Sequence, residues 1–144
     1  MDRIVWSFGV LAIVVGVGTA VVRAQGSAPL RERGAQLYRQ LYCGMCHTLG
    51  AAQTRGSFGP EHNDIGAVAA ARVADPSYHG DADDAAGYLR ESITAPAAYL
   101  APGWAMSSHA MPAYDLSEQD LDALVAFLLA QAASPGATRP PEGR

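Results

Sequence analysis

Hydrophobic residues recur at helical spacing in four parts of this chain. The first stripe predicts a helix from Leu30 to about residue 43, and shorter patterns predict helices over 64–73 and 83–93. Near the end, Ser117 and Asp120 form a variant capping box that opens a fourth helix. No segment shows convincing strand-like alternation, so the pattern predicts an all-α domain. The stripe of the first helix is Leu30, Gly34, Leu37 and Leu41, and that of the last is Leu121, Leu124, Val125 and Leu128.

Gly34 lies inside the first predicted helix, where a glycine costs about 1 kcal/mol relative to alanine. The expected reason for a glycine here is close approach by another helix. We therefore predict that the first and last helices cross, with Phe127 packed against Gly34.

The amino terminus carries an uncharged apolar run over residues 4–22, between Arg3 and Arg23. As a helix it would be roughly 28 Å long, which matches the hydrocarbon core of a bilayer. We predict a membrane anchor or signal segment over 1–24, and an uncleaved anchor is favoured over cleavage after Ala24. Residues 25–133 are the predicted globular domain. Residues 134–144, rich in proline, glycine and charge, are predicted to be a disordered tail.

Charge is unevenly distributed along the predicted domain. Residues 30–55 contain four arginines and one carboxylate, whereas residues 56–133 contain two arginines and eleven carboxylates. The net charge of −4 argues against a nucleic-acid partner, and the 49% hydrophobic content argues against disorder. Such an asymmetry is suited to orienting a docking partner.

The two cysteines of the chain lie in the run Cys43-Gly44-Met45-Cys46-His47, which reads C-x-x-C-H. On one helical turn, both thiols and the imidazole point the same way, as covalent attachment of a c-type haem requires. A thioredoxin-like dithiol needs a βαβ setting, and a structural zinc site needs two further ligands. The sequence shows neither pattern near the motif. The motif predicts one covalent haem c, attached through Cys43 and Cys46, with His47 as an iron ligand.

The second axial ligand must come from elsewhere in the chain. Met45 lies inside the attachment loop, so Met106, Met111 and His109 remain as candidates. Met111 is favoured because Pro112 pushes the preceding residue out of helical geometry and into an extended loop. His47 and Met111 are thus the predicted iron ligands, with Met106 and His109 as alternatives.

These motifs make residues 30–130 similar to a class I cytochrome c, a fold of three to five helices around a covalent haem. The resemblance implies that the Pro60 carbonyl accepts a hydrogen bond from His47, and it also supports Met111-Pro112 as the second ligand loop. The family often has leucine where this chain has His62, which we expect, like His79, at the surface or in a supporting position. Further residues expected near the haem are Tyr99, Trp104 and Tyr114 at its edge and Arg55 or Arg72 beside a propionate.

The resemblance implies an electron-transfer protein rather than an enzyme. We expect a membrane-tethered mono-haem carrier within or between respiratory or photosynthetic complexes, with redox proteins as partners and no small-molecule substrate. Haem attachment in this family takes place outside the cytoplasm, so the domain is expected on the periplasmic side of the inner membrane. The alternative location is soluble in the periplasm after signal cleavage. The alternative function is a catalytic or gas-binding haem with a displaceable sixth ligand.

Overall fold

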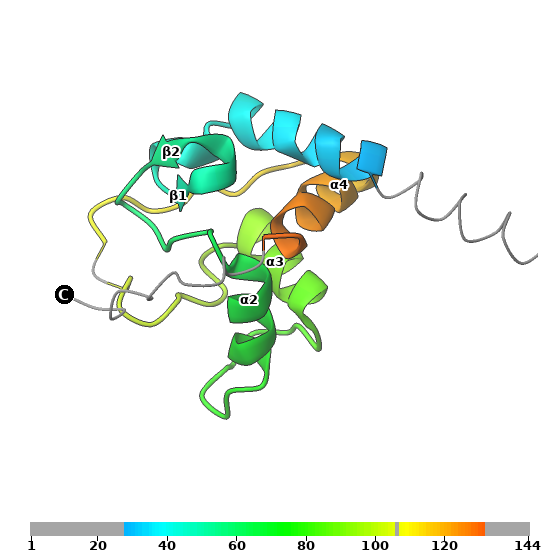
Figure 1. Ribbon diagram of the computed structural model, residues 1–144. Helices are drawn as coiled ribbons and strands as arrows, with labels where there is room; N and C mark the ends of the chain where they lie inside the picture. The colour runs from blue at the N-terminus through cyan, green and yellow to red at the C-terminus, as the bar shows by residue number, and fades with distance from the viewer. Residues whose placement is uncertain (1–27, 106, 132–144) are drawn as a thin grey trace, which may run out of the picture.

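The computed structural model describes residues 28–105 and 107–131, which are mostly helical. Residues 28–40 are helical and are followed by the 3-10 turn η1 (Cys43–Met45), and the helices α2 (Ile65–Val73), α3 (Ala85–Thr94) and α4 (Glu118–Leu129) come later. In Figure 1 the helix over residues 28–40 crosses α4, while α2 and α3 lie beside each other on the other side of α4. The all-α prediction with four helices is confirmed for the bulk of the domain.

The helix boundaries depart from the prediction at the attachment motif. The first helix was expected to run up to the attachment motif, at about residue 43, but it ends at residue 40, and Tyr42 has a left-handed φ of 57°. A left-handed residue breaks the α-helical hydrogen-bond ladder, so the motif starts a separate 3-10 turn. The later helices begin close to their predicted starts. Ser117 caps α4 as predicted and accepts from Asp120 N at 3.2 Å, while Asp84, which was not predicted as a cap, accepts from Gly87 N at 2.7 Å at the start of α3.

A short antiparallel ladder follows the motif and was not predicted. It joins β1 (Thr48–Leu49) to β2 (Thr54–Arg55) across the 3-10 turn η2 (Gly50–Ala52). The hydroxyl of Thr54 accepts from Leu49 N at 3.0 Å and donates to the carbonyl of His47 at 2.9 Å. Strands of two residues are too short to show alternation, which explains why the sequence pattern missed them.

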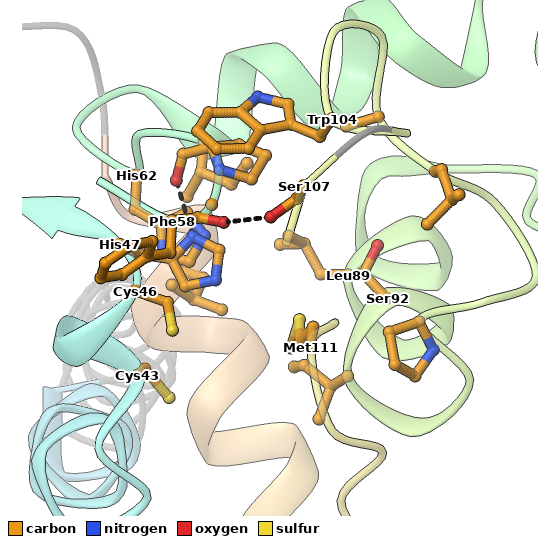
Figure 2. A pocket seen from close by; sticks show the side chains of 18 of the residues that line it. Cys43, Cys46, His47, Phe58, His62, Leu89, Ser92, Trp104, Ser107 and Met111 are labelled. Atoms are coloured by element: carbon orange, nitrogen blue, oxygen red, sulfur yellow. Dashed lines mark hydrogen bonds between the residues drawn. The ribbon is translucent and has the colours of Figure 1, made fainter. Parts of the chain in front are cut away.

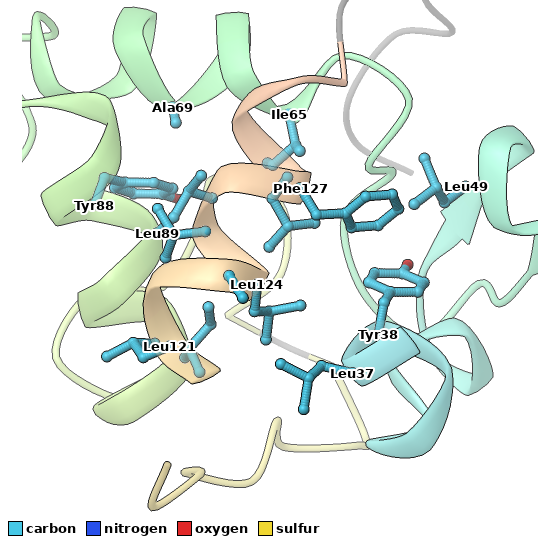
Figure 3. Packing of buried hydrophobic residues seen from close by; sticks show 14 of the residues in the cluster. Leu37, Tyr38, Leu49, Ile65, Ala69, Tyr88, Leu89, Leu121, Leu124 and Phe127 are labelled. Carbon is cyan, nitrogen blue, oxygen red and sulfur yellow. The ribbon is translucent and has the colours of Figure 1, made fainter. Parts of the chain in front are cut away.

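The core lies where the helices meet, and Figure 3 shows Phe127 of α4 among side chains from the other elements. The predicted crossing is confirmed, because a Cβ on Gly34 would lie 2.6 Å from Phe127 Cβ and 2.0 Å from the Ala123 carbonyl oxygen. Burial of one large apolar side chain is worth about 1.5–3 kcal/mol, so this cluster dominates the stability of the domain. Its buried members on α4 include the whole predicted stripe: Leu121, Leu124, Val125 and Leu128.

The predicted anchor over residues 1–24 and the predicted tail over 134–144 lie outside the described residues. Among residues 28–105 and 107–131, no helix is both long and apolar enough to cross a membrane.

Candidate cofactor-binding site

A cavity of about 260 Å³ opens between the attachment motif, the helices α2 and α3, and the loop that precedes α4. It brings together all five predicted cofactor-binding residues, and Figure 2 labels four of them. They come from three separate segments of the chain, so only the folded domain joins them. The five are Cys43, Cys46, His47, Pro60 and Met111.

Cys43 and Cys46 supply the two thiols on one wall of this cavity. Both are half-buried and not in a disulfide, and Figure 2 shows their sulfur atoms pointing to the same side. Burial raises the pKa of Cys43 to about 11, so its thiol stays protonated at neutral pH. The turn that carries them packs tightly, since a Cβ on Gly44 would lie 2.1 Å from Thr54 Cγ2. Two free thiols at this spacing are suited to forming two bonds to one bound group.

His47 is buried, with 6% of its surface exposed, and its Nδ1 lies 2.6 Å from the Pro60 carbonyl oxygen. A carbonyl can only accept, so Nδ1 carries the hydrogen and Nε2 keeps its lone pair. Burial lowers the pKa of His47, which keeps the ring neutral, although the bond to Pro60 opposes this shift. The ring therefore has the tautomer and the charge of a metal ligand.

Gly59 determines how closely the chain passes His47. A Cβ at Gly59 would lie 2.5 Å from His47 Cε1 and 2.9 Å from Nδ1. In the same stretch, Phe58 N and Gly59 N both donate to the Cys46 carbonyl at 3.0 Å. The segment that presents the Pro60 carbonyl is thus tied back to the attachment motif.

His62 was expected at the surface or in a supporting position, and it takes the supporting one. Its ring stacks on His47 with a centroid distance of 3.9 Å and an interplanar angle of 14°. Burial and the neighbouring His47 lower the pKa of His62 well below its ordinary value, so this ring is also neutral. His79, placed in the same class from the sequence, is exposed. His62 therefore supports the site directly, and the cue available in the sequence was its departure from leucine after Pro60.

Met111 lies on the wall opposite the cysteines and is half-buried, and Figure 2 shows it projecting from the loop before α4. Of the alternatives, His109 also lines the cavity but is exposed, with its ring 4.2 Å from that of Phe58 and its Nδ1 2.9 Å from Ser108 Oγ. Met106 lies outside the described residues. Met45 is 69% exposed and does not line the cavity.

The remaining walls are mainly aromatic and aliphatic. The aromatic residues Tyr99, Trp104 and Tyr114 all line the cavity, and the hydroxyl of Tyr114 donates to the Leu41 carbonyl at 3.0 Å. Arg72 also lines it and is buried, with 8% exposed, whereas Arg55 is exposed and lies elsewhere. An apolar slot with two thiols, a neutral imidazole, a thioether and a buried guanidinium fits a porphyrin that carries acidic side chains.

Comparison with known proteins gives one match. A family model described as Cytochrome c matches residues 31–132, which contain every residue of the cavity. No curated protein and no solved structure matches the chain. The domain described by the family model binds covalently attached haem c, in agreement with the donor set of the cavity.

Proposed function

Because this chain belongs to the cytochrome c family, whose domain binds covalent haem c and transfers electrons, we propose that it is a membrane-tethered carrier of single electrons with iron held between His47 and Met111. The observation that carries the ligand assignment is the bond from His47 Nδ1 to Pro60, which leaves Nε2 free to bind a metal. The bound haem supplies an iron that alternates between two oxidation states.

Each residue of the cavity has a distinct part in this proposal. Cys43 and Cys46 would hold the porphyrin through thioether bonds, and His47 would bind the iron. The Pro60 carbonyl orients the imidazole and makes it a stronger donor. Met111, from the opposite wall, would supply the second iron ligand.

This ligand set explains why the protein carries electrons instead of catalysing bond chemistry. If His47 and Met111 both bind the iron, no coordination position would be left open to oxygen, peroxide or substrate. The soft sulfur of methionine favours the ferrous state and raises the reduction potential. The mainly aromatic and aliphatic walls of the cavity would limit the access of water to a bound haem.

Replacement of Met111 by alanine tests the ligand assignment. In the purified holoprotein, Met111→Ala should abolish the sulfur-to-iron charge-transfer band, lower the reduction potential and admit carbon monoxide to the reduced iron. Met45→Ala, in an exposed methionine outside the cavity, is the matched control and should change none of these. An unchanged spectrum in Met111→Ala would transfer the role to Met106 or His109, which the corresponding alanine variants distinguish. Ready binding of carbon monoxide by the unmodified protein would favour the catalytic or gas-binding alternative.

The location and partners are part of the same proposal. The uncharged run over residues 4–22 supports an inner-membrane anchor, with the haem domain on the periplasmic side. Its redox partners are then subunits of respiratory or photosynthetic complexes. Replacing residues 1–24 by a cleavable signal should release a soluble red protein, whereas native protein found already soluble in the periplasm would refute the anchor. Proteins that co-purify with the native membrane form would identify the partner complex.

A further inference from the structure

The His47 imidazole is held at its face as well as at its edge. The edge is held by the Pro60 carbonyl, and the face is covered by His62, whose ring is nearly parallel at 3.9 Å. A hydrogen bond to a carbonyl tolerates a broad range of directions, so one such bond leaves the ring free to tilt. A parallel ring at van der Waals distance prevents tilting toward it.

His62 is itself fixed by two other parts of the fold. Its backbone N–H donates to the Thr48 carbonyl at 2.8 Å, which ties it to β1. Its Nδ1 lies 3.2 Å from the hydroxyl of Tyr38, on the helix over residues 28–40. The stacked ring therefore has a defined position and cannot adapt freely to movements of His47.

Tyr38 connects this arrangement to the hydrophobic core. It is 1% exposed, its ring packs at 5.7 Å against Phe127 of α4, and it meets His62 edge to face at 5.9 Å. Such aromatic pairs contribute about 0.5–1.5 kcal/mol beyond the area they bury. The crossing of the first and last helices thus extends, through Tyr38 and His62, to the face of His47.

We propose that His62 is a positioning residue, which sets the plane of the His47 imidazole above the haem and thereby the electronic structure and reduction potential of the iron. This inference rests on the proposed role of His47 as an iron ligand. The orientation of a planar ligand affects the iron orbitals that it overlaps, so a tilt or rotation of the ring changes the ferric spectrum. His62 also places a polar ring against His47, the proposed iron ligand, and a polar group there would favour the more highly charged oxidised state.

Two substitutions test the stacked His62 ring and the Tyr38 hydroxyl that holds it separately. His62→Leu replaces the planar polar ring by an apolar side chain. Tyr38→Phe removes only the hydroxyl that holds the ring. The matched controls are His79→Leu, in an exposed histidine, and Tyr78→Phe, which removes a hydroxyl that donates to Glu91 outside the cavity. All five holoproteins, including the unmodified one, are compared by electron paramagnetic resonance of the ferric form, by the paramagnetic NMR shifts of the haem methyl groups, and by redox titration.

Both test variants should keep the sulfur-to-iron band and change the g-value spread and the methyl-shift pattern, while both controls keep the unmodified values. His62→Leu should also raise the potential, so that the oxidised-to-reduced ratio at fixed solution potential falls about threefold to tenfold, where tenfold equals about 59 mV for one electron. Tyr38→Phe should give a smaller change in the same direction.

Unmodified spectra and potential in both test variants would overturn the inference, as would control variants that change as much as the test variants do. If His62→Leu attaches no haem, Tyr38→Phe decides by the same criteria. Failure of the proposed ligand set would give a different experimental result: the unmodified protein would itself lack the sulfur-to-iron band or bind carbon monoxide readily.

Discussion

Gly59→Ala tests whether close packing around His47 controls the site. A methyl group at residue 59 would lie 2.5 Å from His47 Cε1, 2.9 Å from Nδ1 and 3.1 Å from Nε2. Gly59 has no positive φ, so alanine suits the backbone and the contact alone produces the effect. His47 cannot simply move away, because the Pro60 carbonyl holds its edge and His62 covers its face.

The size of the effect follows from these distances. Carbon atoms attract best at about 3.5–4.0 Å, so the methyl group overlaps the ring by roughly 1 Å. Overpacking of this kind costs about 1–3 kcal/mol, and with a urea m-value of about 2 kcal/mol per molar the unfolding midpoint should fall by about 1 M. A displaced ring also lengthens the bond from Nδ1 to Pro60, which weakens the imidazole as a donor, so the reduction potential should rise.

The assay is urea unfolding of the purified holoprotein, followed by haem absorbance, together with a redox titration. Gly50→Ala is the matched control, because its Cβ would meet only Asn63 Oδ1, at 3.3 Å. The control should keep both the midpoint and the potential of the unmodified protein. If Gly59→Ala also keeps both, the close approach of residue 59 to His47 has no energetic consequence and the reasoning is wrong.

Two further predictions concern the rest of the domain. Gly34→Ala should lower the free energy of unfolding by about 1–3 kcal/mol, since its methyl group meets the backbone carbonyl of Ala123, which cannot move without separating the helices; an unchanged urea midpoint would contradict this. Burial raises the pKa of Tyr88 above its ordinary value of 10.0, so the folded state keeps this proton while the unfolded chain loses it, and the stability should fall as the pH rises above 10.0. Tyr88→Phe should make urea midpoints measured between about pH 9 and pH 11 depend less on pH, and an unchanged dependence would exclude this tyrosine as a source.

The features that the sequence determined are those whose cause is local. The spacing of Cys43, Cys46 and His47 places three side chains on one turn whatever surrounds them. Ser117 caps its helix through a bond to a residue three positions away. The apolar stripes predicted which helix faces are buried, and a glycine inside one of them predicted the crossing at Phe127, because a missing side chain in a helix indicates close approach.

The end of the first helix was predicted wrongly because apolar spacing does not reveal a left-handed residue such as Tyr42. The hydrogen bond between His47 and Pro60 was indicated by the resemblance to class I cytochromes c and not by any periodicity in the sequence. Arg55 and Arg72 were equivalent in the sequence, and only the fold brought Arg72 to the cavity and left Arg55 outside.

The stack of His62 on His47 is the clearest case of a feature decided by tertiary structure alone. These rings are fifteen positions apart, and between them the chain forms a two-strand ladder joined by the 3-10 turn η2. The position of His62 depends on the path of this loop and on Tyr38, which the helix crossing brings to the same place. A contact between loop residues depends on how all the surrounding segments pack, whereas a helical turn depends only on its own backbone, and this difference separates what the sequence determined from what the fold decided.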